Sequence, residues 1–160
     1  MKVKVQIQLN PEEILYDIKN RTYLKARTGM EGDDYAAASD SVADGGSETD
    51  NQLARSMSNA MAQLRARLSE YEGGDATAAD NVLAGPQQEN IALQVPANFN
   101  TAVTDQIATW AHMFVVNQTL ADWYSLTGSD NCEYYTTLAA ANLDSIEGLV
   151  YKRKRPERQQ

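Results

Sequence analysis

Apolar and polar residues alternate at the start of the chain. The apolar positions are Val3, Val5, Ile7 and Leu9, and lysines and glutamines separate them. Because successive side chains of a strand point to opposite faces, the pattern predicts a strand over residues 2–9 with one apolar face and one wet face. These four residues are the ones we single out for strand-mediated contact between subunits.

A second alternation, over residues 91–95, predicts a short strand that ends before Pro96. Two strands without further partners are only marginally stable in water. The sequence leaves two arrangements open: the strands pair with each other, or either strand completes a sheet with a neighbouring subunit.

Apolar residues three and four positions apart predict four helices. The first starts at Asn10-Pro11 and runs to about Ala26, since Asn is a good cap and Pro suits the first helical position. The second starts at Thr49 or Asp50 and stops at Gly73-Gly74; its apolar stripe is Leu53, Met57, Met61, Leu64, Leu68 and Tyr71.

The third helix is the longest, from Asn98 or Asn100 to about Leu126, and the fourth runs from Asn131 to about Tyr151. The expected fold class is therefore mainly α, a small bundle of about four helices with a minor two-strand β element. An alanine-rich stretch over 76–84 predicts one further short helix. Residues 28–50 are rich in Gly, Ser, Ala and Asp and read as an acidic loop or a disordered segment.

The length of 160 residues suits one domain, which we place at 1–151, followed by a basic tail at 152–160. Charge separates the two parts. The net charge is -8, and from Leu68 to Tyr151 there are eleven acids and no lysine or arginine. The tail carries five basic residues against one acid. A body this acidic repels nucleic acid, which binds to basic faces.

Three interpretations of the tail remain open: contact with nucleic acid, a solvated terminus, and a peptide that docks on an acidic partner. The docking interpretation is favoured because copies of an acidic body can receive copies of a basic tail. Pro156 indicates that the chain continues extended beyond the last helix. The docking residues are Tyr151, Lys152, Arg153, Lys154, Arg155, Pro156 and Arg158.

Candidate catalytic and metal-binding residues are few. His112 is the only histidine and lies between Trp110 and Phe114, which favours a packed or interface role. Cys132 is the only cysteine, so an intrachain disulfide and a zinc site of Cys and His ligands are both excluded. Neighbouring acids at Asp33-Asp34 are typical of a solvated face rather than of acid–base chemistry.

The segment Asp40–Gly45 resembles part of a calcium loop, but Val42 stands where a ligand is needed. Nucleotide-binding motifs are lacking. We therefore expect no cofactor, no metal and no enzymatic activity. The N-terminus lacks the apolar core of a signal peptide, and no stretch is long and apolar enough to span a membrane, so synthesis in the cytoplasm is expected.

The second half of the chain resembles the head–tail connector (neck adaptor) proteins of long-tailed bacteriophages and prophages. The similarity lies in VPANFNTAV, the long helix with Trp110, the helix from Glu133 to Val150, and LVYKRKRP. The first half, MKVKVQIQLNPEEILYDIKNRTYL, is similar to small proteins of phage structural operons. The resemblance implies a homo-oligomeric ring, usually of twelve copies, in the virion neck. It also implies a tail inserted against the portal, contacts with tail and neck proteins, and DNA that passes through the lumen without specific binding.

The leading hypothesis is thus a virion structural protein that connects portal to tail. The alternative is a cytoplasmic, non-enzymatic accessory module that binds one partner protein through its basic tail. An enzyme of unrecognised type is the third and least favoured hypothesis.

Overall fold

A computed structural model describes residues 1–29, 39–43, 46–73, 81 and 88–156. The elements are β1 (Lys2–Leu9), α1 (Pro11–Gly29), α3 (Ser47–Leu68), β2 (Glu89–Pro96), a 3-10 turn (Thr101–Val103), α4 (Thr104–Leu126) and α5 (Asn131–Val150). The predicted fold class is confirmed: four principal helices and one two-stranded antiparallel sheet.

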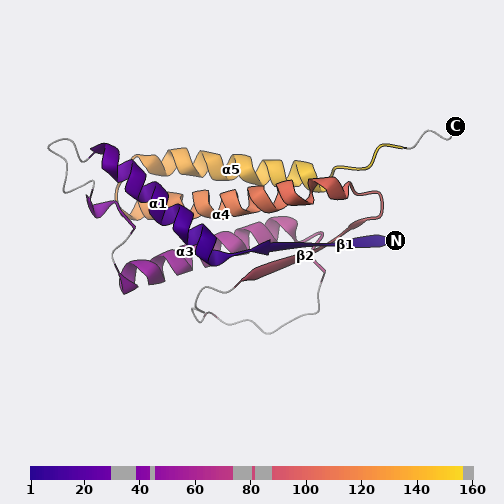
Figure 1. The fold of residues 1–160 in the computed structure, drawn as a ribbon, viewed down its shortest axis with the longest axis horizontal. Coiled ribbons are helices and arrows are strands. Elements are labelled where there is room, and N and C mark those ends of the chain that lie inside the picture. The colour runs from indigo at the N-terminus through magenta and orange to yellow at the C-terminus, as the bar shows by residue number, and fades with distance from the viewer. Residues whose placement is uncertain (30–38, 44–45, 74–80, 82–87, 157–160) are drawn as a thin grey trace.

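Helix α4 is the centre of the bundle. It packs against α5, α3, α1 and β1, and Figure 1 shows it running alongside α5 with α3 below it and α1 crossing it. A helix that contacts neighbours on most sides needs apolar residues on most of its faces. Its buried apolar residues are Ile107, Ala111, Phe114, Val115, Val116, Leu120, Ala121 and Tyr124.

The two strands pair with each other, which decides between the two arrangements that the sequence left open. The antiparallel register runs from Lys2 opposite Pro96 to Leu9 opposite Glu89. The predicted alternation is confirmed, because Val5, Ile7 and Leu9 are buried while the lysines and glutamines between them are exposed. The sheet therefore lays one apolar face on the helices and leaves the other wet.

Side-chain caps begin two helical segments where the sequence indicates. The Glu12 amide donates to Asn10 Oδ1 (2.9 Å) ahead of α1. The Ala102 amide donates to Asn100 Oδ1 (3.2 Å) at the 3-10 turn that leads into α4. The predicted caps of the second helix are wrong, since α3 begins earlier, at Ser47, after Gly46 at φ 84°. Glycine adopts this left-handed backbone without strain.

The predicted loop over 28–50 is wrong at both ends, because α1 continues to Gly29 and α3 takes in residues from Ser47 onward. Between them, Ala43 is fully buried and its amide donates to Thr22 Oγ1 (3.1 Å). The Trp123 indole donates to the Ser41 carbonyl (2.7 Å). Side-chain hydrogen bonds from α1 and α4 thus hold residues 41–43 against the bundle. Residues 30–38 and 44–45, and the predicted helix over 76–84 apart from residue 81, lie outside the described residues.

Tyr124 lies at the centre of the aromatic core. Its side chain is 1% exposed and its ring stacks on that of Tyr135, with centroids 5.4 Å apart. Its hydroxyl has no hydrogen-bond partner among the described residues. Burial, followed by the charge of a nearby ionised Tyr135, raises the pKa of Tyr124 from the ordinary value of tyrosine to about 12.

Stability is therefore expected to fall as pH rises from about 10 to about 12. Below pH 10 tyrosine is neutral in both states, whereas between the two pKa values only the unfolded chain ionises this phenol, which favours unfolding. Tyr124→Phe removes this residue's share of the alkaline loss and also removes an unsatisfied hydroxyl, so it should raise the free energy of unfolding by about 1 kcal/mol at neutral pH. Urea unfolding of both proteins at neutral and alkaline pH measures this. A variant with the same alkaline loss as the parent would contradict it.

Candidate partner-docking site

The first residues of the basic segment after α5, residues 152–154, are hydrogen-bonded to the body of the chain, and we call them the root of the segment. The Lys152 carbonyl accepts from the Asn100 amide (3.1 Å), and the Lys154 amide donates to the Asn98 carbonyl (2.8 Å). Between these bonds, Phe99 and Arg153 form an antiparallel bridge, and the Phe99 side chain is buried. The folded body thus extends to Lys154, three residues beyond the boundary that the sequence predicts.

The docking residues divide into an anchored group and a presented group. The Arg153 guanidinium is half-buried and donates to the Val150 carbonyl (2.9 Å) at the end of α5. The helix dipole stabilises a positive charge at this end of a helix. Lys152, Lys154, Arg155 and Pro156 are exposed, and Arg158 lies outside the described residues. The segment therefore presents three cations from a fixed root.

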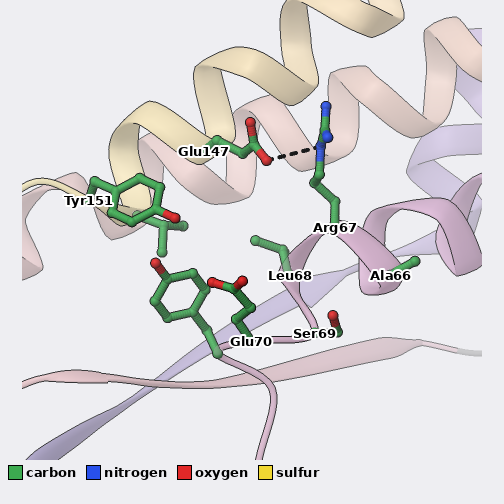
Figure 2. Close-up of a pocket in the computed structure, with 9 residues that line it drawn as sticks. Ala66, Arg67, Leu68, Ser69, Glu70, Glu147 and Tyr151 are labelled. Atoms are coloured by element: carbon green, nitrogen blue, oxygen red, sulfur yellow. Dashed lines mark ion pairs between the residues drawn. The ribbon is translucent and has the colours of Figure 1, made fainter.

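Tyr151 is exposed and meets the ring of Tyr71 edge to face, with centroids 5.9 Å apart. Burial, together with a side-chain hydrogen bond to Tyr151, raises the pKa of Tyr71 to about 12. Both tyrosines line a crevice of about 200 Å³ between the ends of α3 and α5. Figure 2 shows Glu147 reaching from α5 to Arg67, with Nε and Oε1 3.0 Å apart. The crevice thus offers phenol hydroxyls and a paired arginine beside the root of the basic segment.

Both ends of the described chain lie at the same end of the molecule (Figure 1). Lys2 is opposite Pro96, and only three residues further on Phe99 is opposite Arg153. Because three residues span at most about 10 Å, the lysines of β1 lie near the cations of the C-terminal segment. The hairpin turn between α4 and α5, flanked by Asp122, Asp130 and Glu133, is at the opposite end.

The four residues singled out for strand-mediated subunit contact belong to the chain's own core. Val5, Ile7 and Leu9 are buried, and Val3 packs partly buried against them. Their side chains hold β1 on α4, so a further contact made by this strand would use its outer backbone edge and its exposed side chains.

His112 lies half-buried between two helices. Its Nε2 is 2.7 Å from Asp17 Oδ2, and this contact joins α4 to α1. The sequence placed His112 on an apolar helix but missed Asp17, 95 positions away. Cys132 is partly buried beside the core at the start of α5.

The metal and acid–base candidates are only partly described. Asp33, Asp34, Asp44 and Gly45 lie outside the described residues, and Asp40 is exposed. Within the described ranges, no three His, Cys, Asp or Glu side chains gather as metal ligands would. Nor is any helix among the described residues long and apolar enough to cross a membrane.

Three features lie at this end of the molecule: the presented cations, the crevice with its two tyrosines, and the nearby lysines of β1. Together they form the candidate docking surface. Comparison of the chain with protein-family models, with curated proteins and with solved structures finds no match.

Proposed function

We propose that this chain is a non-enzymatic assembly protein of a bacteriophage virion, a ring-forming head–tail connector that docks on the portal or a neighbouring neck protein. One observation carries the proposal: an acidic helical body holds a basic segment by its root and presents the cations beyond it. In this proposal the copies form a homo-oligomeric ring, and Lys152, Lys154 and Arg155 contact an acidic surface of the adjoining protein.

The fixed root favours docking for an entropic reason. A disordered peptide loses conformational freedom when it binds, and this loss subtracts from affinity. Here the backbone bonds of Lys152 and Lys154 to residues 98–100 already fix the start of the segment. The cations are thus aimed before a partner arrives, and each can form a charge-assisted hydrogen bond with a carboxylate.

The charge of the body suits a ring through which DNA passes. Exposed acids such as Glu133 and Asp144 stand on α5, and the sequence has no lysine or arginine between Arg67 and Lys152. Like charges repel over a screening length of about 8 Å at physiological salt. A lumen lined by this surface would let DNA pass without adhering to it.

Charge reversal tests the docking better than truncation does. A chain that ends at Val150 would lose the partners of Phe99 and of the Asn98 and Asn100 backbone, so it would disturb the fold as well. The triple variant Lys152→Glu, Lys154→Glu and Arg155→Glu keeps the backbone bonds. It is expected to weaken binding to the portal protein of the same genome by more than about tenfold at low salt, since it replaces attraction by repulsion.

The matched control reverses three exposed cations elsewhere, on α1 and α3: Lys25→Glu, Arg27→Glu and Arg55→Glu. It makes the same change in net charge and should leave portal binding unchanged. Native mass spectrometry of the chain alone and mixed with portal gives both the ring and the complex. A salt-insensitive monomer that ignores portal protein, or equal losses in both triple variants, would overturn the proposal.

A further inference from the structure

The outer edge of β1 carries unpaired backbone groups, and the register shows which ones. On β2, the Gln94 amide donates to the Tyr71 carbonyl (2.6 Å) and the Ala92 carbonyl accepts from the Gly73 amide (3.4 Å), so residues 92 and 94 direct their backbone groups away from β1. In an antiparallel pair, such residues stand opposite partners that also direct theirs outward. Those partners are Gln6 and Lys4.

Backbone groups alternate between the two edges along a strand, so Lys2 and Gln8 also direct theirs outward. Pro96, which lacks an amide hydrogen, stands opposite Lys2, where β1 needs no hydrogen bond from β2. Lys2, Lys4, Gln6 and Gln8 therefore point their N–H and C=O groups away from β2. Their side chains are exposed, and among the described residues no strand pairs with this edge.

The edge is fit for strand addition. Open edges are commonly protected by shortness, by proline, by a bulge or by charged side chains, lysine above all. Of these, β1 carries Lys2 and Lys4, which repel a basic strand and attract an acidic one. β1 has eight residues, no proline or glycine, and one-to-one pairing with β2 along its length. By contrast, the outer edge of β2 is partly covered by residues 71–73.

Charge selects the kind of strand. The exposed face of β1 carries Lys2 and Lys4, and the first eleven residues contain no acid in a chain of net charge -8. Carboxylates directly across a strand pair from lysines stabilise the pair by about 0.2–1 kcal/mol each. An extended acidic segment is therefore the complementary occupant.

A second copy of the chain fits this edge poorly. Among the described residues, its extended segments are β1 and 152–156, which are both basic, and β2, which has partners on both edges. An antiparallel pair of two β1 strands would leave the lysines of both copies without an acidic partner, since the strand contains no acid. The register centred on Val5 would also place Lys4 diagonal to its own copy, where like charges are unfavourable.

We propose that the outer edge of β1 binds an extended acidic segment of the adjoining protein by adding it as a third strand to the sheet. The inference rests on the proposed function in one respect, since it takes the partner of the basic C-terminal segment as the donor of the strand. Both surfaces lie at the same end of the molecule (Figure 1), so one partner can reach both. Occupation of one then raises the effective concentration at the other.

The test uses the full chain and a defined probe, an acetylated ten-residue peptide of alternating glutamate and threonine. Binding should slow hydrogen exchange at the outward amides of Gln6 and Gln8 and leave Val5 and Ile7, whose amides face β2, unchanged. The same peptide with the amides of both its glutamates and its threonines N-methylated keeps its charge but has no backbone N–H left to donate on either edge. It should bind at least about tenfold more weakly, because several backbone hydrogen bonds are lost.

Two protein variants complete the test. Gln6→Pro removes one outward amide and should weaken binding about tenfold, while Gln6→Thr should bind as the parent does. If circular dichroism shows Gln6→Pro unfolded, Lys2→Glu with Lys4→Glu replaces it. That variant should lose the glutamate peptide and bind an alternating lysine and threonine peptide instead.

Three results would overturn the inference: no binding, equal binding of the N-methylated peptide, or outward amides already protected in the peptide-free protein in a concentration-dependent way. The last result would assign the edge to a second copy. The triple charge-reversal variant of the C-terminal segment should still bind the peptide. Loss of portal binding alone therefore bears on the proposed function, and loss of peptide binding alone bears on the strand site.

Discussion

Phe114→Ala is expected to lower the free energy of unfolding by about 3–5 kcal/mol, the usual cost of deleting a buried phenylalanine. Phe114 is 1% exposed on α4, the helix that contacts α1, α3, α5 and β1. The truncation loses the transfer free energy of the ring and leaves a cavity between elements that cannot all close on it. Because small domains are stable by only about 5–15 kcal/mol, much of the native stability would go.

Trp110→Ala on the same helix is the control. Trp110 is 39% exposed, so its truncation removes a ring that is already partly in water. Its cost should be less than half that of Phe114→Ala in urea unfolding followed by circular dichroism. Equal costs would show that α4 is not the centre of the core and would contradict the packing described above.

Much of the fold could be predicted because its signals are local. The alternation of β1 and the three-and-four spacing of α3 follow from periods of two and 3.6 residues. The cap at Asn10 acts on an amide two positions away. In each case the residues that determine the structure lie within one turn or one strand of each other, so a single sequence displays them.

The contacts that prediction missed are those that join distant segments. The Trp123 indole reaches the Ser41 carbonyl across 82 positions and holds a residue that composition assigned to a loop or disordered segment. The bridge between Phe99 and Arg153 likewise turns the start of a basic tail into part of the body. Backbone carbonyls and amides carry no residue-specific signature, so nothing in the sequence marks these partners.

The candidate docking site shows the same division. Composition identified the cations at 152–155, because a basic cluster stands out after an acidic body. Composition could not distinguish Arg153 from Lys154 and Arg155. The Arg153 side chain donates to a carbonyl at the end of α5, whereas the other two side chains face solvent. Likewise, alternation identified the apolar face of β1, but the open edge follows only from the hydrogen bonds of β2 to residues 71–73.

A polar chain crosses the core between three helices. Asn117 is buried on α4; its Oδ1 accepts from the Arg21 guanidinium (3.1 Å), and its Nδ2 donates to Asn142 Oδ1 (2.8 Å). Each end of this amide thus has a partner on a different helix, Arg21 on α1 and Asn142 on α5. Buried polar groups are tolerated when all are satisfied and are costly when one partner is removed.

Asn117→Leu should therefore destabilise the protein by about 2–3 kcal/mol, although leucine is apolar and similar in size. The substitution leaves the Asn142 amide buried without its donor and deprives the guanidinium of an acceptor. The double variant Asn117→Leu with Asn142→Leu should recover the part of the loss that comes from the unsatisfied Asn142 amide, while the Arg21 guanidinium still lacks its acceptor. Urea unfolding of the wild type, both single variants and the double variant gives the coupling free energy. If the loss of stability in the double variant equals the sum of the losses in the two single variants, the two amides act independently. The hydrogen bond between Asn117 and Asn142 would then not hold α4 against α5.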